Sequence, residues 1–317
     1  MLLCDYFLSK PDKTWKFALQ CGVSHGVIRL PDNGFDPTDL SELKAVTERF
    51  ISHGITPKVV EPLPNSLHDH IKLGDELRDS SIERFIKLMS NLREVGIDTV
   101  CFNFMAHYGW TRTDTVLPER GGASVTGFSL ERFKPDTFEM TSDRIWENYV
   151  YFIKAVIPYA EKYGIKLALH PDDPPLEKLG NVARIFTSLG NIEKGMNIVK
   201  SPNLGVTFCQ ACYRLMGEDL EKAVFTLADK IFFVHFRNVR GNRFNFTETF
   251  HDNGEIDMAA AIRLYQKYCP DGAENIPIRV DHVPTLVGEE NRISGYDALG
   301  RLFAIGYLKG ILDAEKG

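Results

Sequence analysis

The sequence predicts an α/β protein, a single (β/α)8 TIM barrel over residues 1–317, and three observations support this fold. Eight short apolar runs recur along the chain, and longer amphipathic segments lie between them. No Gly/Ser linker or shift in composition divides the 317 residues, a length that suits a barrel of about 250 residues with insertions. A Rossmann sheet is the alternative, but no G-x-G-x-x-G sequence follows any of the runs.

The apolar runs are rich in β-branched residues, as expected for parallel strands that helices cover on both faces. They lie at residues 2–6, 26–30, 57–61, 98–104, 165–170, 204–208, 230–235 and 276–282. We therefore expect these segments to form the barrel in this order, each followed by a helix.

The segments between the runs carry helical patterns, most clearly at 80–96 and 144–164. The second pattern ends at Gly164, a residue suited to a left-handed helix cap. Residues 105–143 follow the fourth strand and are rich in Gly, Thr and Arg, so we expect a long loop there. Loops of this length commonly serve as lids or bind substrate.

Composition excludes several classes of partner. The net charge is −6, from 37 Lys and Arg against 43 Asp and Glu, with no basic patch for nucleic acid. No apolar stretch approaches the roughly 18 residues that span a bilayer, and the N-terminus lacks the basic region of a signal peptide. Six scattered cysteines do not form a disulfide framework. We expect a cytoplasmic enzyme that contacts neither nucleic acid nor membrane.

Four consecutive predicted strands end in possible metal ligands, and such ends converge on one mouth of a barrel. The residues are His170, Cys209, His235 and Asp281, the last followed by His282. Each alone has an ordinary explanation: a satisfied histidine, a small buried cysteine or an aspartate that caps a helix. Together they indicate a shared site. Two imidazoles, a thiolate and a carboxylate suit zinc, manganese, iron or cobalt better than magnesium or calcium.

The stretch "CQAC" at 209–212 also fits a redox C-x-x-C pair. Thioredoxin-like use would require this motif near the first βα junction of a smaller fold, whereas here it lies late in the barrel pattern. We therefore favour a metal ligand at Cys209 and a packing or supporting role for Cys212.

Several ordered motifs resemble those of mannonate dehydratases, which are metal-dependent enzymes with xylose-isomerase-like barrels. They are "LHPDDPP", "GVTFC", "VHFRNVR", "FTETFHDNGEIDM" and "IRVDH" with Tyr296 beyond it, and "HDHIKLG" and "CFNFMAHYGWTRTD" earlier in the chain. The resemblance extends from about residue 57 to the C-terminus and is strongest from 165 to 282.

The resemblance implies roles for particular residues. It makes His282 and Tyr296 the acid–base pair and implies that manganese, or else Fe2+, Co2+ or Zn2+, is the cofactor. The implied metal ligands are His170, Cys209, His235 and Asp281. We further expect the prolines of "HPDDPP" to hold the turn after His170 away from the metal mouth.

Four more residues are candidates for contact with a small-molecule sugar acid. Arg237 is placed to pair with the substrate carboxylate through its planar guanidinium, or else forms a surface salt bridge. Arg112, His68 and His251 are weaker candidates for binding substrate hydroxyls.

The resemblance implies dehydration of D-mannonate to 2-keto-3-deoxy-D-gluconate. A base removes the C2 proton and an acid protonates the departing C3 hydroxyl. The sequence does not decide which of His282 and Tyr296 is the base. The alternatives are a metal-dependent sugar isomerase or epimerase on the same barrel, which would keep the hydroxyl, and a non-catalytic sugar-binding protein. We also expect a homo-oligomer.

Overall fold

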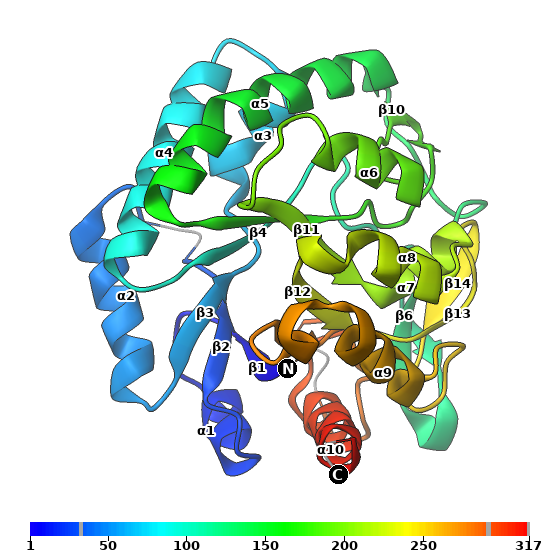
Figure 1. Cartoon of the computed structure of the whole chain (residues 1–317). Helices are drawn as coiled ribbons and strands as arrows, with labels where there is room; N and C mark the ends of the chain where they lie inside the picture. Colours follow the sequence, from blue (N-terminus) through cyan, green and yellow to red (C-terminus); the bar gives the residue numbers. More distant parts are fainter. Residues whose placement is uncertain (32–33, 290–292, 316–317) are drawn as a thin grey trace.

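The computed structural model describes residues 1–31, 34–289 and 293–315, and the predicted strands close into one parallel barrel (Figure 1). Around the barrel the order is β1-β15-β12-β11-β8-β4-β3-β2. The strands are β1 (Leu2–Phe7), β2 (His25–Ile28), β3 (Thr56–Val60), β4 (Thr99–Asn103), β8 (Lys166–His170), β11 (Leu204–Cys209), β12 (Ile231–Phe236) and β15 (Pro277–Val280). The predicted barrel is confirmed, and each strand begins and ends within a few residues of its apolar run.

Helices surround the barrel on its outer side (Figure 1). They are α1 (Lys13–Gln20), α2 (Leu40–Ser52), α3 (Asn65–Leu73), α4 (Arg78–Glu94), α5 (Ser142–Tyr163), α6 (Leu189–Met196), α7 (Gln210–Met216), α8 (Leu220–Leu227), α9 (Met258–Tyr268) and α10 (Ala298–Ala314), with short 3-10 turns at Arg120–Gly122, Ala228–Lys230 and Pro270–Ala273. No helix in the described part of the chain has the length and apolar character to cross a membrane.

Helix α5 shows how sequence signals set an element's bounds. Thr141 caps its N-terminus, because the Thr141 side chain accepts a hydrogen bond from the Arg144 backbone N–H. Gly164 caps its C-terminus with a left-handed φ of 66°, as predicted for a glycine cap. Its buried side chains, such as Phe152 and Val156, face α4 and the barrel wall.

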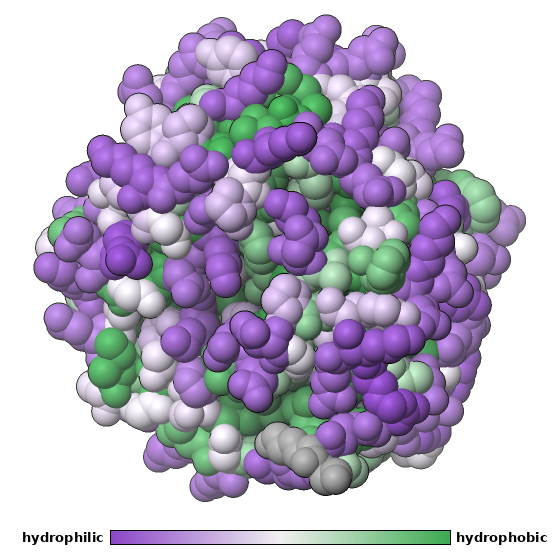
Figure 2. All heavy atoms as spheres, in the orientation of Figure 1, coloured by the Kyte–Doolittle hydropathy of each residue, from purple (hydrophilic) through white to green (hydrophobic). Residues whose placement is uncertain are grey.

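The core has two parts because alternate residues of each strand point to opposite faces. Residues such as Cys4, Val59 and Phe233 form a cluster inside the barrel, whereas Phe7, Val60 and Val234 pack outward against the helices. Figure 2 shows that the face seen in Figure 1 carries mostly hydrophilic side chains, with apolar atoms visible between them.

The prediction of a loop at 105–143 is wrong in one respect, because part of this segment forms strands. Strands β5 (Asp114–Pro118) and β6 (Ser124–Ser129) join the hairpin β13 (Val239–Asn242) and β14 (Asn245–Glu248), which follows β12, in a sheet of order β13-β14-β6-β5. A smaller sheet joins β7 (Glu139–Met140) to β10 (Asn181–Ala183) and β9 (Lys178–Leu179).

The contact between β6 and β14 explains why this segment is ordered. Phe128 pairs in register with Phe246, and both rings are buried. Gly127 allows the close approach, since a Cβ there would lie 2.9 Å from the Phe246 carbonyl oxygen and 2.4 Å from the Leu117 side chain. The insertion is therefore fixed to the segment after β12.

Candidate active site and metal centre

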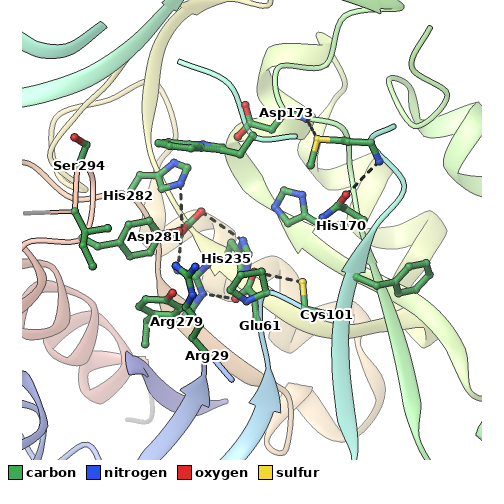
Figure 3. A pocket seen from close by; sticks show the side chains of 18 of the residues that line it. Arg29, Glu61, Cys101, His170, Asp173, His235, Arg279, Asp281, His282 and Ser294 are labelled. Carbon is green, nitrogen blue, oxygen red and sulfur yellow. Dashed lines mark hydrogen bonds and ion pairs between the residues drawn. The ribbon is translucent and has the colours of Figure 1, made fainter. Parts of the chain in front are cut away.

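A cavity of about 440 Å³ opens at the carboxyl ends of the barrel strands (Figure 3). Its lining includes Tyr6, Arg29, Glu61, Cys101, Asn103, Trp110, His170, Asp173, His235, Arg279, Asp281, His282 and Tyr296. Most of these side chains come from strand ends or from the residues directly after them, which is where barrels of this class build their sites.

The structure brings the four predicted ligands together. Cys209 and His235 pair in register on the neighbouring strands β11 and β12. Donor atoms of Cys209, His235 and Asp281 lie within 4.8 Å of one another, and His170 forms a second such group with Cys209 and Cys212. The His170 and His235 ring centroids are 5.0 Å apart.

Cys209 is the more acidic of two adjacent buried thiols. Burial raises its pKa, but the neighbouring side chains of Cys212, His170 and His235, together with the charge of Arg237, outweigh this and hold the pKa well below its usual range. Burial and the neighbouring Cys209 sulfur raise the pKa of Cys212 well above its usual range. The pair thus favours a thiolate, the form that binds metals, at Cys209.

The surroundings of the buried His235 ring fit a bound cation. Its Nε2 lies 3.0 Å from Glu61 Oε1 and its Nδ1 lies 3.4 Å from Asp281 Oδ2. Neither buried nitrogen has hydrogen-bond geometry to any group in the described residues. Burial and Arg279 lower the pKa of His235, but Glu61 and Asp281 raise it overall, to about 10. Carboxylates that favour a proton on this ring also favour a metal ion, which competes with the proton for the nitrogen.

The turn after His170 differs from the expectation. The Nδ1 of His170 lies 2.6 Å from the Pro171 carbonyl, so Nδ1 donates and Nε2 is left to bind a metal. Asp172 turns away and accepts the Phe186 backbone N–H, whereas Asp173 lines the cavity. The expectation that the prolines hold this turn away from the mouth is therefore wrong, because the turn returns Asp173 to the mouth.

His282 and Tyr296 face each other on the cavity wall, with ring centroids 5.5 Å apart. The Tyr296 hydroxyl donates to Asp281 Oδ1 at 3.1 Å, and burial together with Asp281 raises its pKa well above the usual range. Strand alternation would send His282 away from the face that Asp281 occupies. However, β15 has already ended at Val280, and a φ of 43° at His282 turns its ring into the same cavity.

Comparison with known proteins adds a second line of argument. The family model described as D-mannonate dehydratase (UxuA) matches residues 20–138 and 130–317. The chain is 35% identical to a mannonate dehydratase of Streptococcus agalactiae serotype III (strain NEM316) over 306 residues, 86% of this chain and 85% of that protein.

This chain belongs to the mannonate dehydratase family. It is also 31% identical to mannonate dehydratase 2 of Halalkalibacterium halodurans over 86% of both chains. The crystal structure of mannonate dehydratase from Streptococcus suis serotype 2 matches with a TM-score of 0.90 and 28% identity, covering 99% of this chain and 94% of that one. A D-psicose 3-epimerase at 12% identity and a TM-score of 0.62 shares the fold.

In this member of the family, Arg237 and Arg112 lie in a buried ion-pair network. Arg237 is fully buried, so the alternative of a surface salt bridge is wrong. Both guanidiniums pair with Asp173 and Glu248, at distances between 2.6 and 2.8 Å. The described lining of the cavity does not include either arginine. The pairing of Arg237 with a substrate carboxylate stays a prediction, and its donors already contact protein carboxylates.

The two weaker histidine candidates lie apart from the mouth. His68, on α3, lines a separate small void behind β4 and has its Nδ1 3.1 Å from the Pro64 carbonyl. His251 is buried, and its Nε2 lies 2.7 Å from the Phe236 carbonyl. Contact of either ring with substrate would require these packed regions to open.

Sequence reasoning missed several residues of the site. Glu61 directly follows β3 and pairs with both His235 and Arg279. It ends the third apolar run, so the rule that selected the other strand-end ligands could have found it. Glu248 lies in the hairpin after β12, and no local signal in the sequence marks it as part of the site.

Proposed function

We propose that this protein dehydrates a sugar acid, with D-mannonate as substrate and 2-keto-3-deoxy-D-gluconate and water as products. The observation that carries the proposal is the pairing of His282 and Tyr296 across one cavity, next to the donor set of Cys209, His235 and Asp281. Relatives named mannonate dehydratase support the choice of substrate.

We propose a divalent metal as cofactor, with Mn2+ first and Fe2+, Co2+ or Zn2+ as alternatives. The orphaned nitrogens of His235 and the acidic thiol of Cys209 fit such an ion. The residues that would hold it are His170, Cys209, His235 and Asp281. When bound, a divalent cation supplies positive charge that acidifies the C2 proton and stabilises negative charge on the substrate.

The protein's own side chains carry the proton transfers. One member of the pair His282 and Tyr296 removes the C2 proton, and the other protonates the C3 hydroxyl as it departs. Each is at most partly exposed, and both line a cavity that the insertion residue Trp110 also lines.

The test is incubation of the manganese-loaded protein with a panel of hexonates in D2O. Formation of a 2-keto-3-deoxy acid from D-mannonate is the expected result. Exchange of the C2 proton with solvent, without release of water, would refute the dehydratase and favour an epimerase. Product from another hexonate but not from mannonate would keep the reaction and change the substrate.

We also propose a reducing compartment, the cytoplasm. All six cysteines are free thiols, and the site requires Cys209 as a thiolate. Oxidation of Cys209 would remove a sulfur donor from the proposed metal site.

A further inference from the structure

His282 has a backbone conformation that most residues avoid. Its φ of 43° lies in the left-handed region, where a side chain with a Cβ pays a steric cost. Such residues persist when the surroundings fix them, and they cluster at functional sites. Backbone hydrogen bonds on both sides hold this turn: Asp281 N–H donates to Phe236 O and Val283 N–H donates to Gly295 O, each at 2.8 Å.

The surroundings also fix the position of the His282 imidazole. The ring is buried between Trp110, with centroids 5.1 Å apart, and Tyr296, at 5.5 Å. Its Nδ1 lies 3.1 Å from Glu248 Oε1, a hydrogen-bond distance. Its Nε2 lies 3.7 Å from Asp281 Oδ1, beyond hydrogen-bond distance. The two ring nitrogens therefore have different partners.

Glu248 is an ionised carboxylate with no proton to give. Burial raises its pKa, but Arg237, His282 and Arg112 outweigh burial and hold the pKa well below its usual range. A carboxylate in this state only accepts hydrogen bonds. The shared hydrogen bond must therefore use a proton on Nδ1 of His282.

Two guanidiniums fix Glu248 in place. Arg237 donates from Nε to Oε2 at 2.8 Å and from Nη2 to Oε1 at 2.7 Å, and Arg112 donates from Nη2 to Oε1 at 2.7 Å. Asp173 accepts from both arginines and completes a network of two positive and two negative groups. Paired charges and bidentate geometry allow this cluster to remain buried.

We propose that Glu248 is a positioning residue for His282: it accepts the Nδ1–H and so directs the unprotonated Nε2 into the cavity. The ring then exchanges protons with substrate through Nε2 alone, without rotation about its side-chain bonds. This inference rests on the proposed function in one respect, the catalytic use of His282. It also gives the sheet β13-β14-β6-β5 a function, because β14 delivers the carboxylate to the end of β15.

The first test measures which ring nitrogen of His282 carries the proton. In zinc-loaded protein, which is diamagnetic, long-range 1H–15N spectra distinguish Nδ1–H from Nε2–H imidazoles. The chain has nine histidines, and the signals lost in His282→Asn identify the ring. We expect the neutral ring in the wild-type protein to be in a single Nδ1–H form, because Nδ1 lies 3.1 Å from Glu248 Oε1. A predominant Nε2–H form would overturn the proposal, and this measurement requires no variant of Glu248.

The second test uses a matched pair of variants, Glu248→Gln and Asp173→Asn. Each removes one carboxylate charge from the same two arginines, but only Glu248 contacts the His282 ring. We expect Glu248→Gln to lose the single Nδ1–H form and Asp173→Asn to keep it. Loss of an orienting partner of this kind costs about 10- to 100-fold in activity, and we expect it in kcat, with KM within about threefold.

If both variants keep the Nδ1–H form, the assignment of Glu248 is wrong. The spectra need no substrate, so they separate this inference from the proposed function. Wild-type protein that shows Nδ1–H but does not dehydrate mannonate would leave the positioning intact and refute the reaction. Wild-type protein that dehydrates mannonate with His282 in the Nε2–H form would support the proposed reaction and refute the positioning role of Glu248.

Discussion

Replacing Arg237 with alanine tests whether the buried ion network contributes to stability. The Arg237 guanidinium is fully buried and pairs with Asp173 and Glu248, which are themselves buried. Without this guanidinium, Arg112 is the one arginine among the described residues that still pairs with both Asp173 and Glu248. Breaking a buried ion pair by deleting one partner costs about 3–5 kcal/mol.

This cost converts to a shift in the midpoint of thermal unfolding. An unfolding entropy of about 2.1 cal/mol/K per residue gives roughly 0.67 kcal/mol/K for 317 residues. The expected loss is therefore about 4–8 °C, measured by scanning calorimetry at neutral pH. The matched control is Arg263→Ala, because Arg263 pairs with Glu315 at 2.8 Å but has a side chain that is 53% exposed.

Exposed ion pairs contribute about 0–1 kcal/mol, so the control variant should shift the midpoint by at most about 1.5 °C. Equal shifts in the two variants would refute the reasoning, because burial would then make no difference. A shift below about 2 °C for Arg237→Ala would also refute it.

Three further predictions concern the site. Cys209→Ala should lose stoichiometric metal, measured by plasma emission spectrometry after desalting, whereas Cys212→Ala should retain it; retention by both would show that the ligand assignment is wrong. Denatured, chelated protein should titrate six free thiols with Ellman's reagent, and a stable Cys209–Cys212 disulfide in active protein would revive the redox interpretation. His282→Asn should keep the fold and the metal but lose roughly two to four orders of magnitude in turnover of mannonate, and Tyr296→Phe should behave similarly; near wild-type turnover by His282→Asn would count against the acid–base pair.

The barrel could be predicted because its signal is local. Each strand is buried on both faces and appears in the sequence as an apolar run, so the strands were found within a few residues. The proximity of the candidate ligands followed from the same signal, since the carboxyl ends of barrel strands converge. Their positions at strand ends were enough to predict that Cys209 lies near both His170 and His235.

The features that the sequence did not predict depend on contacts between segments that are far apart in the chain. Arg112 lies 136 residues from Glu248 in the chain, and nothing near either residue indicates that they pair. The pairing of β6 with β14 joins two short strands from different insertions; β6 falls within the predicted loop at 105–143, and no prediction covers β14. The φ of 43° at His282 is likewise set by neighbours on other elements rather than by local sequence preference.

The shared sheet has a consequence for engineering this scaffold. The insertion after β4 supplies β5, β6 and Arg112, while the hairpin after β12 supplies β14 and Glu248. A graft that exchanges residues 105–143 alone would separate Arg112 from Glu248 and Phe128 from Phe246. The two segments should therefore be transplanted as one cassette, and among natural variants we expect substitutions in one to be accompanied by substitutions in the other.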